Sequence, residues 1–252
     1  MPLIRLDKFI SERTEYTRSA IKTLAAKGKI TVDGCVVRKS DSKIDSETAA
    51  VTICGEAVRN AKFRYILMNK PCGYVCSTED NDGLSVLDLV PSQLRSKGLF
   101  PAGRLDKDSC GALLITDDGE LAHKMLSPKK HVPKIYIVEL AEKFQDKYVD
   151  EFAKGILLSD GALCMPARVK AVENCDKQAF VELHEGKYHQ VKRMFAALGN
   201  HVEKLTRLTV GGLILPKKLG FGECLELLHK DVENLFNPPD FEVFCSEFFS
   251  DF

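Results

Sequence analysis

The chain has 252 residues, of which 44% are hydrophobic and 29% charged, a composition that excludes wholesale disorder and allows one large domain or two. Lys and Arg together number 36, as do Asp and Glu, so the formal net charge is zero. No apolar stretch approaches the roughly 20 residues needed to cross a bilayer. The N-terminus has no signal-peptide pattern either, so we expect a cytoplasmic protein without membrane contact.

Residues 1–60 are predicted to form a small separate unit with two helices, the second capped by Thr17 and ended by Gly28. A hairpin is predicted around the turn dipeptide Asp33-Gly34, and one more strand follows at 51–53. Residues 54–63 show no periodicity, and we expect them to be a linker.

A larger domain is predicted over residues 64–236. Its expected strands are 64–68, 111–116, 134–140, 179–184 and 223–228, and its expected helices are 120–127, 146–154 and 189–198. Because these elements interleave without a strict βαβ rhythm, they favour an α+β fold with a mainly antiparallel sheet flanked by helices. The acidic, Phe-rich tail 237–252 is predicted either to dock through its phenylalanines or to be disordered.

The nine cysteines have irregular spacing in a chain without a signal-peptide pattern, which predicts reduced thiols. Cys72 and Cys76 form the one close pair. Zinc sites usually combine two such pairs or add histidines, so no metal site is expected.

The zero net charge conceals a strong segregation of charge along the chain. Residues 1–39 carry nine basic and four acidic groups, and residues 185–218 carry seven basic and two acidic groups. Four lysines without an acid lie in 123–134, whereas 219–252 has eight acids and one lysine. The basic segments predict a phosphate-binding face with salt-sensitive affinity for nucleic acid. The alternative is that they are solvated surface groups that contribute solubility.

Three stretches of the N-terminal unit, 5–10, 17–19 and 28–34, resemble the S4 domain, a small RNA-binding module found in ribosomal protein S4. The resemblance implies that two helices and a hairpin present basic side chains to structured RNA. The side chains that we expect to contact RNA are Arg5, Arg18, Lys22, Lys27 and Lys29.

Five ordered blocks of the larger domain resemble the RsuA-type pseudouridine synthases of bacterial ribosomal RNA. They are Asn69–Thr78 (NKPCGYVCST), Gly103–Asp106 (GRLD), Leu114–Gly119 (LITDDG), Lys134–Tyr136 (KIY) and Glu185–Phe195 (EGKYHQVKRMF). The resemblance implies an enzyme that breaks the N1–C1′ bond of uridine, rotates the uracil and rejoins it through C5. This isomerisation moves no net electrons, so no cofactor is expected.

The resemblance also implies roles for individual residues. Asp106 matches the nucleophile or base near the sugar, and Tyr136 matches an active-site tyrosine that can stack on uracil and take the C5 proton. Lys192 matches the cation that keeps such a carboxylate ionised, at a position where many related synthases have Arg. The resemblance implies that Arg104 helps to hold the flipped-out nucleotide and its neighbours. Further RNA contacts are expected at Lys134, Lys187 and Arg193.

Some of these residues also have purely structural interpretations. Asp106 taken alone could be a salt-bridged or capping residue, and Asp117–Gly119 is best interpreted as a turn and helix N-cap. His189 taken alone could be a general base, but its place in the run Tyr-His-Gln-Val-Lys favours a positioning role at the start of the following helix.

We therefore predict an S4 module joined to a domain that forms pseudouridine in 16S rRNA, acting as a monomer on free RNA or a pre-ribosomal particle. The small-subunit target is favoured because 73–78 and 185–200 look closest to that type and because the C-terminus is acidic. The alternatives are a 23S enzyme of the same family and a non-catalytic S4-type assembly factor. Retention of Asp106, Tyr136 and Lys192 argues against the second alternative.

Overall fold

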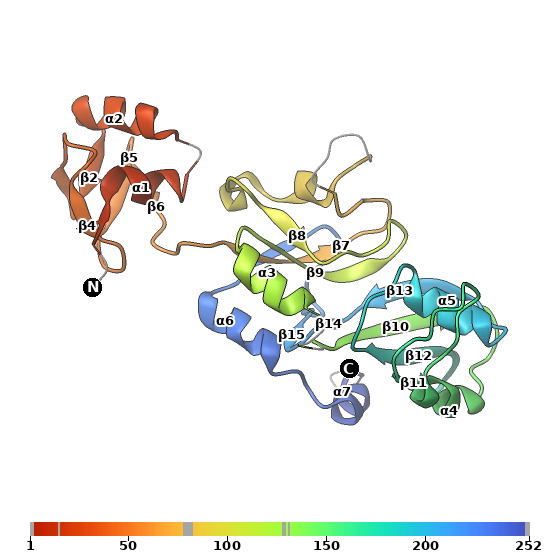
Figure 1. The fold of residues 1–252 in the computed structure, drawn as a ribbon. Helices are drawn as coiled ribbons and strands as arrows, with labels where there is room; N and C mark the ends of the chain where they lie inside the picture. Colours follow the sequence, from red (N-terminus) through yellow and green to blue (C-terminus); the bar gives the residue numbers. More distant parts are fainter. Residues whose placement is uncertain (1–2, 15, 78–82, 128–129, 131, 250–252) are drawn as a thin grey trace. The chain divides into compact units, whose positions relative to one another are not determined.

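The computed structural model describes residues 3–14, 16–77, 83–127, 130 and 132–249, and it divides into two compact units (Figure 1). The N-terminal unit comprises Met1–Arg64 and Ser92–Leu99, and the larger unit comprises Tyr65–Pro91 and Phe100–Phe252. Three parts of the predictions lie outside the described residues: Thr78, Lys129 of the basic segment, and 250–252 of the tail.

The N-terminal unit contains two helices, a four-stranded antiparallel sheet in the order β3-β2-β5-β6, and the strand pair β1-β4. Its elements are β1 (Leu3–Arg5), α1 (Leu6–Ser11), α2 (Arg18–Ala26), β2 (Ile30–Val32), β3 (Cys35–Val36), β4 (Lys43–Asp45), β5 (Val51–Ile53) and β6 (Glu56–Val58). The Thr17 side chain accepts a hydrogen bond from the Ala20 N–H, and Gly28 follows the helix with a φ of +68°, so both predicted helix signals are confirmed. Apolar side chains of both helices are buried against β2 and β5.

The predicted linker 54–63 is wrong in its first half, because Glu56–Val58 forms β6 and pairs with β5. Cys54 and Gly55 both have positive φ values, which makes them a tight hairpin turn between these strands. The strand has three residues and one buried side chain, so it leaves no periodic pattern in the sequence.

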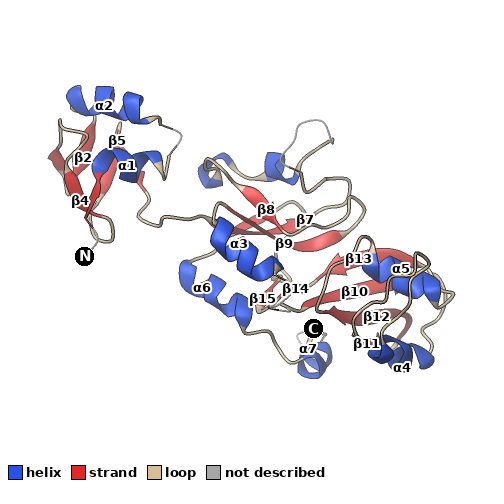
Figure 2. Cartoon of the chain, in the orientation of Figure 1, coloured by secondary structure: helices blue, strands red, loops and turns tan. Residues whose placement is uncertain are grey.

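The larger unit is built on a mixed sheet in the order β11-β12-β10-β13-β9-β7-β16, with β8 paired to β9 (Figure 2). Its strands are β7 (Tyr65–Lys70), β8 (Phe100–Ala102), β9 (Cys110–Thr116), β10 (Lys134–Leu140), β11 (Arg168–Val172), β12 (Cys175–Leu183), β13 (Val202–Arg207), β14 (Thr209–Val210), β15 (Leu213–Ile214) and β16 (Cys224–Glu226). Its helices are α3 (Gly119–Leu126), α4 (Lys147–Lys154), α5 (Gln190–Ala197), α6 (His229–Glu233) and α7 (Phe241–Glu247). Short 3-10 turns lie at Val86–Leu89, Ser92–Leu94 and Asn234–Phe236, the second of them within the N-terminal unit.

The α+β class and the mainly antiparallel sheet are confirmed. Among the described strands of this sheet, β9 and β13 form the parallel pair, and the other neighbours are antiparallel. Asp118 caps α3 by accepting from the Leu121 N–H, so the predicted turn and N-cap are also confirmed.

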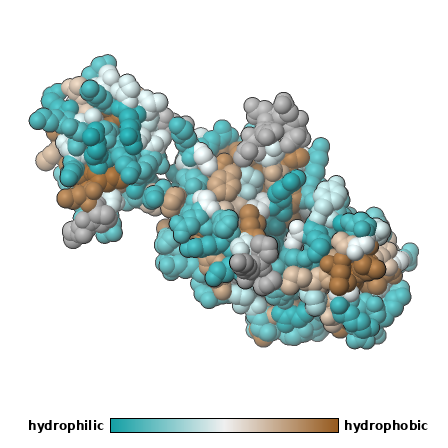
Figure 3. All heavy atoms as spheres, viewed as in Figure 1, coloured by the Kyte–Doolittle hydropathy of each residue, from teal (hydrophilic) through white to brown (hydrophobic). Residues whose placement is uncertain are grey.

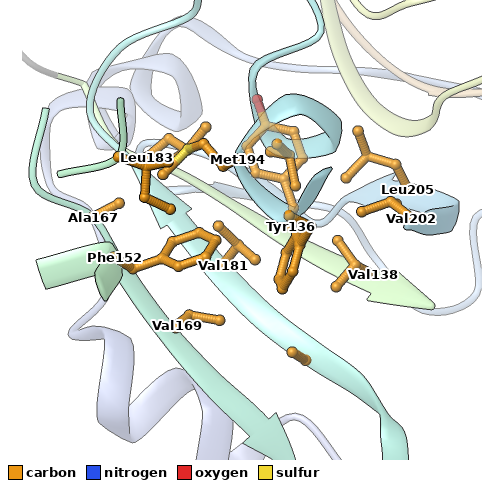
Figure 4. Packing of buried hydrophobic residues seen from close by; sticks show 14 of the residues in the cluster. Tyr136, Val138, Phe152, Ala167, Val169, Val181, Leu183, Met194, Val202 and Leu205 are labelled. Carbon is orange, nitrogen blue, oxygen red and sulfur yellow. The ribbon is translucent and has the colours of Figure 1, made fainter. Parts of the chain in front are cut away.

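Side chains alternate between the two faces of the sheet along β10 and β12. Tyr136 and Val138 lie in the hydrophobic cluster between the sheet and the helices α4 and α5 (Figure 4). In the same cluster, Phe152 and Phe195 pack with ring centroids 5.0 Å apart. Phe180 points to the opposite face and contacts α7.

The C-terminal segment is docked, which decides between the two alternatives left by the sequence. Phe241 is fully buried, Phe244 lies in the same cluster as Phe180, and the Lys170 ammonium bonds Glu242 at 2.7 Å. Residue 236 is therefore not a domain boundary, because α7 completes the core on this face of the sheet.

Cys72 and Cys110 form a disulfide with Cα atoms 5.4 Å apart, so the prediction of reduced thiols is wrong for this pair. The β7–β9 register, which pairs Lys70 with Gly111, brings the two cysteines together across 38 residues of sequence. Within the described ranges, no helix is long and apolar enough to cross a membrane, and no cluster of His, Cys, Asp and Glu is arranged to hold a metal ion.

Candidate active site

A cavity of about 650 Å³ opens in the larger unit. Its walls come from the loop 103–109, from β10 and β13, and from the loop before α5. The sequence-predicted residues that line it are Arg104, Asp106, Lys134, Tyr136 and Lys187.

The loop that carries Asp106 is held in place by the buried Lys70, which bonds its backbone. Lys70, at the end of β7, is fully buried, and its ammonium donates to the carbonyl oxygens of Asp106 at 3.0 Å and Ser109 at 2.8 Å, as well as to Pro71 at 3.1 Å. Burial lowers the pKa of Lys70, while the carboxylates of Asp106 and Asp108 act in the opposite direction. Lys70 thus fixes the backbone on which Asp106 stands.

Arg207 holds the same loop from the other side. It is buried at the end of β13, and its guanidinium donates from Nε to the Ala112 carbonyl at 2.7 Å and from Nη1 to the Arg104 carbonyl at 3.2 Å. Its Nη2 is buried and has no hydrogen-bond partner among the described residues. Arg207 therefore ties the loop to β9 across the parallel β9–β13 pairing, which we call the seam of the sheet.

The seam depends on a glycine. Gly111 pairs with Arg207 across it, has a φ of +106°, and would place a Cβ 2.2 Å from the Arg207 carbonyl oxygen. A side chain at this position would force the two strands apart.

Asp106 is partly open to the cavity, with 29% of its side chain exposed. Its Oδ1 lies 3.6 Å from Nε2 of His189, an ion-pair distance when the imidazole is protonated. His189 is the N-cap residue of α5, as interpreted from the sequence, but its side chain makes no cap hydrogen bond. Its φ of +48° is left-handed, a costly conformation for a residue with a Cβ, and it points the ring at Asp106 instead.

Lys192 has a different partner from the one that the sequence suggested. Its ammonium lies 2.5 Å from Asp108 Oδ2, two residues beyond Asp106 on the same loop. The hydrogen bond from Lys192 lowers the pKa of Asp108. Lys192 therefore ties α5 to the loop, and the side chain that the structure brings to the Asp106 carboxylate from this region is the His189 imidazole.

Two further predicted cations beside α5 are also paired. Lys187 forms an ion pair with Glu185, and Arg193 forms one with Asp160 at 2.5 Å. Each pair fixes a long side chain close to the loop before α5.

Tyr136 and Lys134 lie two residues apart on β10, and both line the cavity. Tyr136 is only 8% exposed and packs in the core beside Leu183 and Met194. Lys134 donates to the Val132 carbonyl at 2.9 Å. Burial, with a smaller contribution from the charge of Arg207, lowers the pKa of Lys134 to about 8.

The basic residues predicted to bind RNA in the N-terminal unit are mostly solvent-exposed. The exposed side chains on and after α2 belong to Arg18, Lys22, Lys27 and Lys29. Arg5 is also exposed, and it forms a bidentate pair with Asp7, with bonds of 3.1 and 2.7 Å. The face of this unit drawn in Figure 3 is predominantly hydrophilic.

Sequence reasoning assigned no role to Lys70, Arg207 or Tyr188. Lys70 stands inside a motif block, so its position could have been noticed, but its carbonyl partners could not. Arg207 follows the last block, and only the strand pairing brings it to the loop.

The cavity thus combines a partly exposed carboxylate, a tyrosine and several cations at the seam of a mixed sheet. Residues 64–197 match the family model described as RNA pseudouridylate synthase, so the chain belongs to this family of RNA-modifying enzymes.

Individual relatives sharpen the assignment. The chain is 40% identical over 234 residues to the ribosomal small subunit pseudouridine synthase A of Vibrio cholerae, covering 92% of this chain and 100% of the relative, and 37% identical over 233 residues to the Escherichia coli K12 protein of the same name, with the same coverage. An uncharacterized RNA pseudouridine synthase of Bacillus subtilis, YtzG, is 38% identical over 239 residues, covering 94% of this chain and 99% of the relative. A pseudouridylate synthase crystal structure superposes with a TM-score of 0.64 at 35% identity, over 92% of this chain and 99% of that one. The RsuA-type resemblance predicted from the sequence is confirmed.

Proposed function

We propose that the protein converts uridine to pseudouridine in 16S rRNA, with Asp106 as the nucleophile. The observation that carries the proposal is the Asp106 carboxylate, which opens into a cavity large enough for a nucleotide and shares it with Tyr136. Relatives matched over their whole length are named small-subunit enzymes, which supports the choice of RNA.

The reaction begins when the target uridine leaves its stack and enters the cavity, since its reacting atoms are inaccessible within stacked RNA. Arg104, which is exposed at the rim, is suited to hold the displaced strand through its phosphates. Tyr136 offers a ring for the extruded uracil.

Asp106 then makes the covalent step possible. Its carboxylate attacks the nucleoside, the N1–C1′ bond breaks, and the uracil rotates before C5 bonds to C1′. The C5 proton leaves, N1 gains a proton, and the carboxylate is released unchanged. In this proposal Tyr136 gives its hydroxyl proton to N1 and accepts the C5 proton on the resulting phenolate oxygen. The Lys70 ammonium and the His189 imidazole lie near the attacking carboxylate.

The N-terminal unit acts as an S4-like RNA-binding module in this proposal. The exposed cations around α2 can neutralise phosphates of structured rRNA. The protein acts as a monomer in the cytoplasm, on free 16S rRNA or on a pre-ribosomal particle.

The proposal is tested by incubating the full chain with 16S and 23S transcripts, each with and without ribosomal proteins, and mapping pseudouridine. We expect product in 16S RNA. Product confined to 23S RNA would overturn the small-subunit assignment.

The nucleophile is tested with Asp106→Asn, which keeps the shape of the side chain and removes its charge. We expect product to fall below detection while RNA affinity stays near that of the unmodified chain. The matched control is Asp150→Asn, which removes an exposed carboxylate from α4, outside the cavity lining, and should retain turnover. Turnover retained in Asp106→Asn would show that another group attacks.

A further inference from the structure

Tyr188 is an exposed aromatic side chain in the wall of the cavity. It is 73% exposed, although most aromatic side chains of this chain are at least partly buried. Exposing an aromatic ring forgoes the stabilisation that burial would provide, so its position at the rim calls for a partner with an apolar face.

The ring is held in place by its neighbours. It stacks on the His189 imidazole, with centroids 3.9 Å apart and planes inclined by 17°. The Tyr188 carbonyl oxygen accepts from Arg193 Nη1 at 3.3 Å, and Arg193 is anchored in turn by Asp160. Because the imidazole covers one face of the phenol, the exposed area belongs mainly to the other face and the edge.

The position of the Tyr188 ring relative to Asp106 indicates which group would stack on it. His189 links the two, since one edge of its ring faces Asp106 at 3.6 Å while its face lies against Tyr188. A uridine extruded toward Asp106 leaves a neighbouring base without its stacking partner. A rigid aromatic face at the rim is suited to replace that partner, because every base has a π-face.

We propose that Tyr188 is the stacking platform for an unpaired base adjacent to the target uridine. The inference rests on the proposed function in one respect, namely that the substrate is RNA. It assigns Tyr188 a part in substrate binding and leaves the bond-making steps to the residues already named.

The first experiment replaces the ring while keeping its apolar character. Stacking of one base on an aromatic side chain is worth enough to change affinity by roughly 5- to 150-fold. Tyr188→Leu should therefore weaken binding to the 16S transcript about 10-fold or more. The salt dependence of binding should not change, because no charge is removed. Tyr188→Phe keeps the π-face and should bind within about twofold of the unmodified chain.

The control is Phe221→Leu, which removes an aromatic ring that is 67% exposed but does not line the cavity. It should leave RNA affinity unchanged. Thermal unfolding of each variant separates a loss of stacking from a loss of structure, and an exposed ring should leave the midpoint unchanged.

The second experiment observes stacking directly. The chain has no tryptophan, so Tyr188→Trp introduces a single fluorescent reporter. Addition of the 16S transcript should quench its emission, whereas Phe221→Trp should respond little. Unquenched emission from the RNA-bound Tyr188→Trp variant, or normal affinity in Tyr188→Leu, would overturn the platform.

These outcomes are distinct from failure of the proposed function. If the unmodified chain forms pseudouridine and Tyr188→Leu binds normally, only the platform is refuted. If the unmodified chain neither binds nor modifies the transcript, the proposed function itself fails.

Discussion

The cations of the N-terminal unit and those around the cavity have opposite surroundings. Arg18 and Lys22 are exposed to solvent, whereas Lys70 and Arg207 are buried with their donors directed at backbone carbonyls. The exposed set can neutralise phosphates wherever they approach, and its contribution depends on salt. The buried set organises the loop of Asp106 and is shielded from salt. Under the proposed function, basic residues of the same chain thus serve RNA binding in one unit and the geometry of the site in the other.

The largest effect is expected from Lys70→Met, which removes the donor shared by several carbonyl oxygens of the loop. Each buried acceptor left without a donor costs about 1–3 kcal/mol, so the free energy of unfolding should fall by about 3 kcal/mol or more. Urea denaturation measures the change. Lys22→Met on exposed α2 is the matched control and should stay within about 0.5 kcal/mol. Equal effects of the two variants would remove the distinction between the two sets of cations.

Arg207→Met tests whether the second buried cation serves geometry. It removes the donors to Ala112 and Arg104 while keeping most of the apolar stem. We expect kcat to fall about 100-fold, since a displacement of about 1 Å is sufficient for such a loss. KM for RNA should change little, and steady-state kinetics separate the two parameters. A change confined to KM would show that Arg207 contributes to RNA binding and not to the geometry of the site.

The exposed set is tested by Arg18→Glu combined with Lys22→Glu. RNA affinity should fall about 10-fold, and the salt slope should shrink by about one unit for each phosphate that is no longer neutralised, while kcat at saturating RNA is unchanged. Binding isotherms at several salt concentrations provide both quantities. Lys147→Glu with Lys154→Glu on α4 changes the net charge equally and should have a smaller effect. Unchanged affinity in the α2 variant would show that the N-terminal unit does not contact RNA.

The smallest effect is expected from Lys134. It lies between the exposed and the buried cations, because it is partly buried yet lines the cavity. Its pKa of about 8 means that the ammonium loses its proton as the pH rises through that value, so RNA affinity should decrease a few-fold between about pH 7 and about pH 9. Lys134→Arg keeps its charge and should flatten the profile. The stability of the fold changes with pH in the opposite direction to RNA affinity. Between about pH 8 and pH 10.5, the ordinary pKa of lysine, the unfolded chain keeps the Lys134 proton while the folded chain has lost it. The folded state therefore gains stability as the pH rises through this range. An identical pH profile in Lys134→Arg would exclude Lys134 as its source.

Sequence patterns predicted the periodic elements of the fold well. The strand 134–140 and the helix 146–154 match β10 and α4 within a residue, because both have clear apolar periodicity. The central strand β13 was missed. Two of its buried positions are Leu205 and Arg207, and a buried arginine interrupts the apolar pattern by which a strand is recognised.

The candidate site was predictable where side-chain identity carried the information. Ordered motifs pointed to Asp106 and Tyr136, and both line the cavity. The partners of Lys70 and Arg207 are main-chain carbonyls, which have no signature in sequence. The sequence suggested Asp106 as the partner of Lys192, whereas the structure pairs Lys192 with Asp108. Which of two carboxylates on one loop lies closer to the lysine depends on distances that residue order does not encode.

The seam between β9 and β13 also orders events during synthesis. Arg207 lies 95 residues beyond Ala112, so the loop that carries Asp106 is translated long before its second anchor exists. A nascent chain that ends before β13 can form the β7–β9 pairing and the Lys70 hydrogen bonds, but it lacks Arg207 and the Tyr136–Arg207 strand pair. The cavity therefore acquires its full geometry only after β13 has left the ribosome and docked, which keeps an incomplete chain from presenting a finished site to RNA.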